Sequence, residues 1–120
     1  FLLNMYSFKF REKGFEVTPV LSSVDALNKL RNNELFDVIL LDLMMPVING
    51  FEFLDILKKE QLAQNSKIIV LSNLGQPADI EKSKSLGANS YIVKASSTPT
   101  EVVEKAIATM ETLSLEPNKN

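Results

Sequence analysis

A continuous apolar run that ends in a single carboxylate is the feature that most constrains the fold of this chain. Residues 35–41 are apolar at every position except Asp37, Asp42 follows at once, and a turn with Pro46 and an Asn-Gly pair (49–50) comes next. A strand with one exposed face would alternate apolar and polar residues, so the run indicates a strand covered on both faces, as in a parallel α/β sheet. Asp42 would then lie at the carboxyl edge of the sheet, where open α/β folds bind ligands. On this segment alone, an Asp42 that only caps the turn before the next helix is equally consistent.

The composition excludes several classes of site. The chain has 120 residues, 45% of them hydrophobic, which indicates one globular domain with a sizeable core. It contains neither Cys nor His, which excludes disulfides, thiolate metal sites and histidine general bases. The net charge of −2, with both signs scattered along the chain, predicts no direct nucleic-acid binding. No apolar segment approaches transmembrane length, so we expect no membrane partner and a cytoplasmic location.

Helical and strand patterns alternate along the chain without a low-complexity linker. The expected helices cover residues 1–13, 22–32, 51–59, 77–86 and 98–113, and the expected strands cover residues 15–20, 36–41, 67–72 and 90–93. Because a helix follows each strand, we predict an α/β fold with a doubly wound parallel sheet and right-handed crossovers. Residues 1–115 form the predicted domain, and residues 116–120 are predicted to be a disordered tail or the start of a linker.

Three polar residues stand at the ends of successive predicted strands: Asp42, Ser72 and Lys94. The carboxyl ends of parallel strands share one edge, so we expect these side chains to converge. A carboxylate nucleophile, a hydroxyl donor and an ammonium group are what a phosphoryl-acceptor site needs. Each residue alone is more typical of a turn cap or a solvated charge, and it is their joint placement that favours a site.

The same segments resemble the receiver domains of two-component response regulators. The resemblance rests on LLDLMMPVINGFEFLDILK around Asp42, on KIIVLSN with Ser72, and on LGANSYIVKA with Tyr91 and Lys94, and it covers the chain except its start. It implies a flavodoxin-like, three-layer receiver fold. It also implies that Asp42 takes a phosphoryl group from the phosphohistidine of a sensor histidine kinase or phosphotransfer protein, and that Ser72 and Lys94 bind the phosphoryl oxygens. Ser72 and Tyr91 would then rearrange and alter the surface of the fourth and fifth helices and the last strand.

By this resemblance the chain is a signalling domain and not a conventional enzyme. A nucleotide-dependent α/β enzyme is disfavoured, because no Gly-x-Gly-x-x-Gly or Walker-type loop is present. A phosphatase of the haloacid type would want a second aspartate at position 44, where this chain has Met44.

The largest departure from the family is at the amino end. Receivers begin with a central strand that ends in an acidic pair, which holds Mg²⁺ together with the acceptor aspartate, whereas residue 1 of this chain already lies in the expected first helix. Asp42 and the backbone carbonyl of Met44 are the remaining expected ligands, so we expect weak Mg²⁺ binding, or none, without that pair. Two explanations stay open. The first strand belongs to the protein but not to this sequence, or the protein lacks it and is a phosphorylation-independent pseudo-receiver that acts as an interaction module.

Three residues near the site are expected to tune its chemistry. Met44 and Leu74 flank the route of an attacking water in the family geometry and neither can orient it, which predicts slow loss of the phosphoryl group. Asn73 stands where the family usually has a small residue, which predicts narrower access.

Two partner surfaces follow from the resemblance. The first helix should dock a kinase, with Leu2, Tyr6 and Phe10 as an apolar contact unless they face the core. A homodimer through the last two helices would pair charged residues, which otherwise form an ordinary solvated surface: Lys82, Lys84, Glu101, Glu104 and Lys105.

Overall fold

The computed structural model describes the backbone of residues 2–115 and the side chains of residues 5–111. The chain divides into two compact units, one formed by Val20–Lys94 and the other by the segments on either side of it. We describe each unit by itself.

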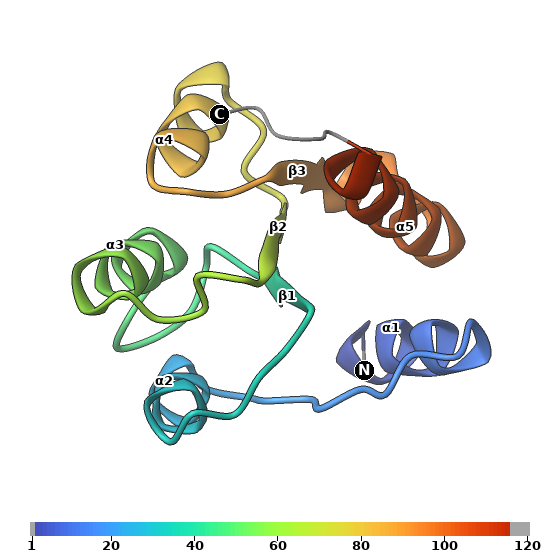
Figure 1. Cartoon of the computed structure of the whole chain (residues 1–120). Helices are drawn as coiled ribbons and strands as arrows, with labels where there is room; N and C mark the ends of the chain where they lie inside the picture. The colour runs from blue at the N-terminus through green and yellow to red at the C-terminus, as the bar shows by residue number, and fades with distance from the viewer. Residues whose placement is uncertain (1, 116–120) are drawn as a thin grey trace. The chain divides into compact units, whose positions relative to one another are not determined.

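The Val20–Lys94 unit is an α/β layer structure (Figure 1). Its elements are α2 (Ser23–Arg31), β1 (Val38–Leu41), α3 (Gly50–Glu60), β2 (Lys67–Ser72), α4 (Pro77–Ser85) and β3 (Ser90–Val93). The strands are parallel in the order β1-β2-β3, with Leu41 opposite Val70 and Ser72 opposite Val93. The three helices lie on one side of the strands. The parallel α/β sheet predicted from the alternating pattern is confirmed.

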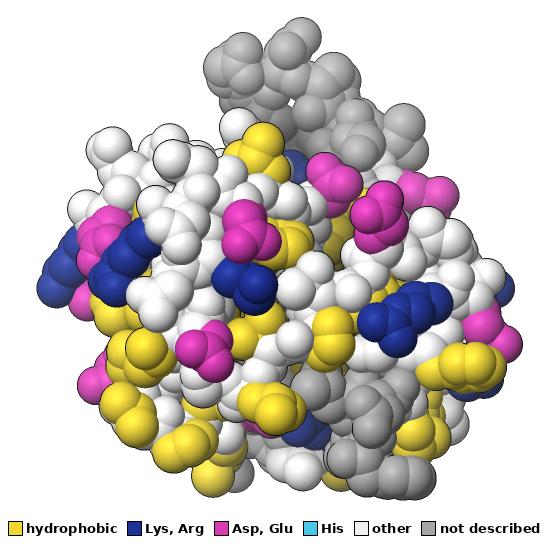
Figure 2. All heavy atoms as spheres, turned by 90° about the horizontal axis from the view of Figure 1, so that it is seen from below, with side chains coloured by type: hydrophobic (Ala, Val, Ile, Leu, Met, Phe, Trp, Pro, Cys, Tyr) yellow, Lys and Arg dark blue, Asp and Glu magenta, His cyan; other side chains and the backbone are white. Residues whose placement is uncertain are grey.

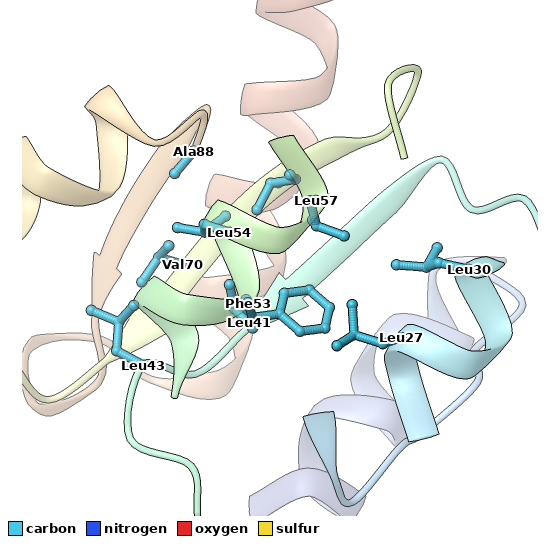
Figure 3. Packing of buried hydrophobic residues seen from close by; sticks show 10 residues of the cluster. Leu27, Leu30, Leu41, Leu43, Phe53, Leu54, Leu57, Val70 and Ala88 are labelled. Carbon is cyan, nitrogen blue, oxygen red and sulfur yellow. The ribbon is translucent and has the colours of Figure 1, made fainter. Parts of the chain in front are cut away.

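The core of this unit forms where α2 and α3 pack on β1 and β2. Phe53 and Leu54 of α3 and Leu27 of α2 are each 1% exposed, and Figure 3 shows the Phe53 ring directed at Leu27. Val70 of the central strand is fully buried, with Leu41 of β1 beside it in the same cluster. Each of these side chains stabilises the fold by roughly 1.5–3 kcal/mol when it leaves water.

Local hydrogen bonds set where the helices begin. The Ser22 hydroxyl accepts from the Asp25 N–H at 3.1 Å and caps α2. Asn49 and Glu52 form a reciprocal capping box at the start of α3, each side chain accepting from the other's backbone N–H at 2.9 Å. Pro77 occupies the first turn of α4, where its missing N–H costs nothing.

The second unit contains α1 (Leu2–Glu12) and α5 (Pro99–Leu115), which pack against each other. Tyr6 and Phe10 of α1 are buried. Beyond α1, Gly14 adopts a φ of +92°, which ends the helix as its position predicted. The Phe15 ring then meets Phe10 edge-on, with the ring centroids 5.3 Å apart. The 3-10 turn Lys94–Ser96 connects β3 to the segment that leads into α5.

The strand predicted over residues 15–20 is wrong. These residues are described and have no regular secondary structure. A strand exists only when a neighbour pairs with its backbone. Here the backbone is held instead by local bonds, from Phe15 N–H to the Phe10 carbonyl and from the Arg11 guanidinium to the Val17 carbonyl.

Other element boundaries move by one or two residues. The strand expected from residue 36 begins at Val38, and the Phe36 carbonyl before it accepts a bond from the Ser66 hydroxyl. The predictions for residues 116–120 lie outside the described residues. Within the described part of the chain, no helix is long and apolar enough to cross a membrane.

Candidate functional site

Asp42 and Lys94 meet at the carboxyl edge of the sheet. Asp42 follows β1 directly and Lys94 follows β3 directly. The Lys94 Nζ donates to Asp42 Oδ2 at 2.5 Å, and the side chains remain 33% exposed at Asp42 and 21% exposed at Lys94. The other carboxylate oxygen, Oδ1, accepts from the Met44 N–H at 2.9 Å. The structure therefore brings together a half-buried carboxylate and an ammonium group that the sequence separates by half the chain.

Ser72 ends the central strand, between the strands that carry Asp42 and Lys94. Its side chain is fully buried, and its hydroxyl oxygen accepts from the Leu74 N–H at 3.2 Å. Ser72 thus lies at the predicted sheet edge, and its hydroxyl is engaged with the loop that leads to α4. The three residues share one edge, but the direct side-chain bond joins only Asp42 and Lys94.

Tyr91 on β3 is coupled to this edge by a hydrogen bond and by electrostatics. Its hydroxyl donates to the Leu74 carbonyl. Burial raises the pKa of Tyr91 above its ordinary value, and the negative charges of Asp79 and Asp42 raise the pKa further, while the Ser72 hydroxyl acts in the opposite direction. The direct contact of the phenol is with the Leu74 backbone, the same residue whose N–H the Ser72 hydroxyl accepts.

The predicted tuning residues lie in the loops that follow β1 and β2. Met44 contributes its N–H to Asp42 and exposes two thirds of its side chain. Asn73 is exposed, and Leu74 is partly buried against the core. Their effects on water and on access remain predictions.

The loop between Asp42 and α3 is closed by the backbone of Gly50. The Gly50 N–H donates to the Leu43 carbonyl at 3.0 Å. A Cβ at position 50 would lie 2.6 Å from the Leu43 Cα and 2.8 Å from the Asp42 carbonyl oxygen, so only glycine fits. The sequence marked this glycine as part of a turn, but the close approach of α3 to the end of β1 had no sequence signal.

The sequence analysis missed two further residues that shape this loop, one within it and one in α2. Val47 has a φ of +69°, and the Ile48 N–H donates to the Pro46 carbonyl at 2.8 Å, which together define a γ-turn of the strained type. Ser23 of α2 donates its hydroxyl to the Ile48 carbonyl at 2.7 Å. A serine at the start of a helix is ordinarily taken as a cap, which concealed this contact.

The residues present do not by themselves fit a magnesium site. Among the described residues there is no group of three or more His, Cys, Asp or Glu side chains that could hold a metal ion. Asp42 supplies a carboxylate whose two oxygens already accept from Lys94 and Met44. Mg²⁺ requires near-octahedral oxygen coordination, to which this edge contributes one carboxylate and the neighbouring backbone carbonyls.

The surfaces predicted to bind partners differ from expectation at the first helix. Tyr6 and Phe10 are buried, as the core-facing alternative predicted, while the aromatic residue that α1 exposes is Phe8. The Leu2 side chain lies outside the described residues. Figure 2 shows charges of both signs interspersed with apolar side chains on one face.

The charges predicted to form a dimer face make local contacts. Lys82 lies 4.5 Å from the centroid of the Phe51 ring, and Lys105 donates to the Ser97 hydroxyl. A dimer through these residues remains a prediction.

Comparisons with known proteins agree with this geometry. A family model described as the response regulator receiver domain matches residues 2–107. The phosphate regulon transcriptional regulatory protein PhoB of Klebsiella pneumoniae is 32% identical over 111 residues, which cover 92% of this chain and 48% of PhoB. This chain thus spans about half the length of that relative.

Solved structures match nearly the whole chain. The receiver domain of Francisella response regulator 1452 is 27% identical, with a TM-score of 0.81 over 93% of this chain and 89% of that one. The chemotaxis protein CheY4 of Vibrio cholerae is also 27% identical, with a TM-score of 0.80 over 90% of this chain and 88% of that one.

Proposed function

The chain belongs to the response regulator receiver domain family of two-component signalling, and we propose that it accepts a phosphoryl group on Asp42 from a phosphohistidine. The family is a signalling module and not a conventional enzyme, with a histidine kinase as its general partner. For this chain we propose a sensor histidine kinase or a phosphotransfer protein as the phosphoryl donor. We also propose that the chain acts in the cytoplasm. The observation that carries the proposal is the contact between Asp42 and Lys94 at the carboxyl edge of the sheet.

The proposed reaction uses residues already in place. A carboxylate oxygen of Asp42 attacks the phosphorus, the phosphorus–nitrogen bond to the donor histidine breaks, and an acyl phosphate forms. The donor imidazole leaves with the electron pair of that bond. The Lys94 ammonium donates to Asp42 Oδ2 in the structure. This ammonium and the Ser72 hydroxyl are suited to bind the phosphoryl oxygens as negative charge grows on those oxygens. One third of the Asp42 side chain is exposed, so a donor can reach it.

The proposed output is a change at Tyr91 and the loop before α4. Phosphorylation adds negative charge at Asp42, which lies within electrostatic reach of the Tyr91 phenol. Ser72 and Tyr91 both bond the backbone of Leu74, so a phosphoryl group that draws the Ser72 side chain toward Asp42 would displace the loop that holds Leu74. A rearranged loop would alter the surface of the fourth and fifth helices and the last strand, which is the proposed switch.

Magnesium is part of the proposal only at the level of the family, whose members typically use it. Asp42 and the Met44 carbonyl are the ligands this edge would offer. We expect these residues alone to bind Mg²⁺ weakly. A magnesium titration of the phosphorylation rate that saturates as tightly as in receivers with an acidic pair would contradict that expectation.

The test is intact mass spectrometry after incubation with acetyl phosphate and a magnesium salt. We expect one phosphoryl addition in the wild-type protein and none in an Asp42→Asn variant. An addition that persists in Asp42→Asn would reject Asp42 as the acceptor. A folded wild-type protein with no addition, from acetyl phosphate or from a phosphorylated histidine donor, would reject the function and favour the phosphorylation-independent interaction module.

A further inference from the structure

The loop that follows Asp42 contains a backbone turn that its own side chain does not hold in place. Val47 sits at the centre of the γ-turn with a φ of +69°. Positive φ is unfavourable for a β-branched residue, because Cβ crowds the following carbonyl. The Val47 side chain is 87% exposed, so packing of that side chain cannot compensate. The conformation must be maintained by bonds made elsewhere in the loop.

Ser23 supplies such a bond from a different element. Its hydroxyl donates to the Ile48 carbonyl at 2.7 Å, and the Ser23 side chain itself is 2% exposed. Ser22, and not Ser23, caps α2. The Ser23 hydroxyl is therefore not used to cap the helix, and it is available to bond the loop. The Ile48 N–H donates to the Pro46 carbonyl, and the Ile48 carbonyl accepts from Ser23, so both backbone polar groups of Ile48 are hydrogen-bonded.

The γ-turn at Val47 is connected through the loop backbone to the carboxylate of Asp42. The loop closes where the Gly50 N–H bonds the Leu43 carbonyl, and the next residue, Met44, donates its N–H to Asp42 Oδ1. If the turn at Val47 changes, the backbone between Leu43 and Gly50 must shift, because the hydrogen bond between these two residues closes the loop. The Met44 amide belongs to that stretch of backbone. We propose that Ser23 is a positioning residue for Asp42, because it holds the strained turn at Val47 and thereby the Met44 amide that orients the carboxylate.

Ser23→Ala removes the hydroxyl, and Ser66→Ala is its matched control. Ser66 also donates a serine hydroxyl to a backbone carbonyl, that of Phe36, but at the opposite end of β1. We expect Ser23→Ala to lower the rate constant for phosphorylation of Asp42 by acetyl phosphate about fivefold or more, the factor expected for loss of one net hydrogen bond. Ser66→Ala should leave that rate constant unchanged.

A double-mutant cycle with Val47→Gly tests the mechanism. Glycine adopts positive φ without strain, so the turn should then persist without Ser23. We expect Ser23→Ala to change the phosphorylation rate little in the Val47→Gly background, which also supplies a folded protein if Ser23→Ala alone does not fold. A similar loss of rate in both backgrounds, or a double variant that does not fold, would overturn the proposal by showing a general structural role.

The kinetic readout rests on the proposed function. A second readout is therefore needed that does not depend on phosphorylation. Amide hydrogen exchange of the full chain reports the Met44 and Ile48 N–H groups directly. We expect Ser23→Ala, but not Ser66→Ala, to accelerate exchange at both amides. If the wild-type protein takes no phosphoryl group, the proposed function fails while exchange still tests Ser23. Unchanged exchange at Met44 in Ser23→Ala would reject the positioning role even where phosphorylation occurs.

Discussion

Gly50→Ala is the substitution whose effect the structure specifies most closely. The added Cβ would lie 2.6 Å from the Leu43 Cα, 2.7 Å from the Leu43 Cδ2 and 2.8 Å from the Asp42 carbonyl oxygen. Two of these three atoms belong to the backbone and cannot rotate away. The first turn of α3 must therefore move away from the end of β1, or the end of β1 must shift with it.

The magnitude follows from two opposing effects. Alanine favours a helix over glycine by up to about 1 kcal/mol, which would stabilise the variant. Overpacking against backbone atoms typically costs about 1–3 kcal/mol and sometimes more. Since contacts below 3.0 Å on three atoms lie at the severe end of that range, we expect a net loss of about 2 kcal/mol or more in the free energy of unfolding.

The assay is urea unfolding followed by circular dichroism, with Gly75→Ala as the control. At Gly75 an added Cβ would meet only the Val93 methyl groups, at 3.8 Å, which is ordinary contact. Gly75→Ala should be neutral or stabilising by about 0.4–1 kcal/mol, because alanine restricts the unfolded chain. A Gly50→Ala variant as stable as the wild type would refute the close approach of α3 to the strand.

Four other variants have defined outcomes. Asn49→Ala removes the capping box of α3, and we expect urea unfolding to show a loss of about 1 kcal/mol. Because the pKa of Tyr91 is raised in the fold, its contribution to stability should be complete below the unfolded pKa of about 10 and decline as the pH rises through the folded pKa. Tyr91→Phe should abolish that part of the alkaline loss, and Asp42→Asn should lower the pKa of Tyr91 in an absorbance titration. If phosphorylation occurs, Met44→Asn combined with Leu74→Glu should shorten the lifetime of the acyl phosphate, and an unchanged lifetime would contradict the roles of these residues.

The strands that form were readable from the sequence because burial on both faces leaves a continuous apolar run. Residues 67–72 and 90–93 were predicted with the bounds they have as β2 and β3. The same reasoning was wrong for residues 15–20. Apolar residues with strand propensity do not form a strand unless another backbone pairs with them, and a pattern along one segment carries no information about its neighbour.

The convergence of Asp42 with Lys94 was also predictable, because parallel strands place their carboxyl ends at one edge whatever lies between them. The sequence could not predict that the Lys94 ammonium bonds Oδ2 while Oδ1 takes the Met44 N–H, since these choices depend on loop geometry. It could not predict either that the Tyr91 hydroxyl bonds the Leu74 carbonyl.

The sequence by itself therefore determined the helices, the three parallel strands that form and the residues at the carboxyl edge of their sheet, because burial and chain order follow from local patterns. Only the tertiary structure decided how that edge is held. Ser23 bonds a loop 25 positions away, and Gly50 is required because two backbone segments meet there. Contacts between residues far apart in the chain arise from packing. The identity of a serine or a glycine in the sequence does not indicate whether such a contact exists.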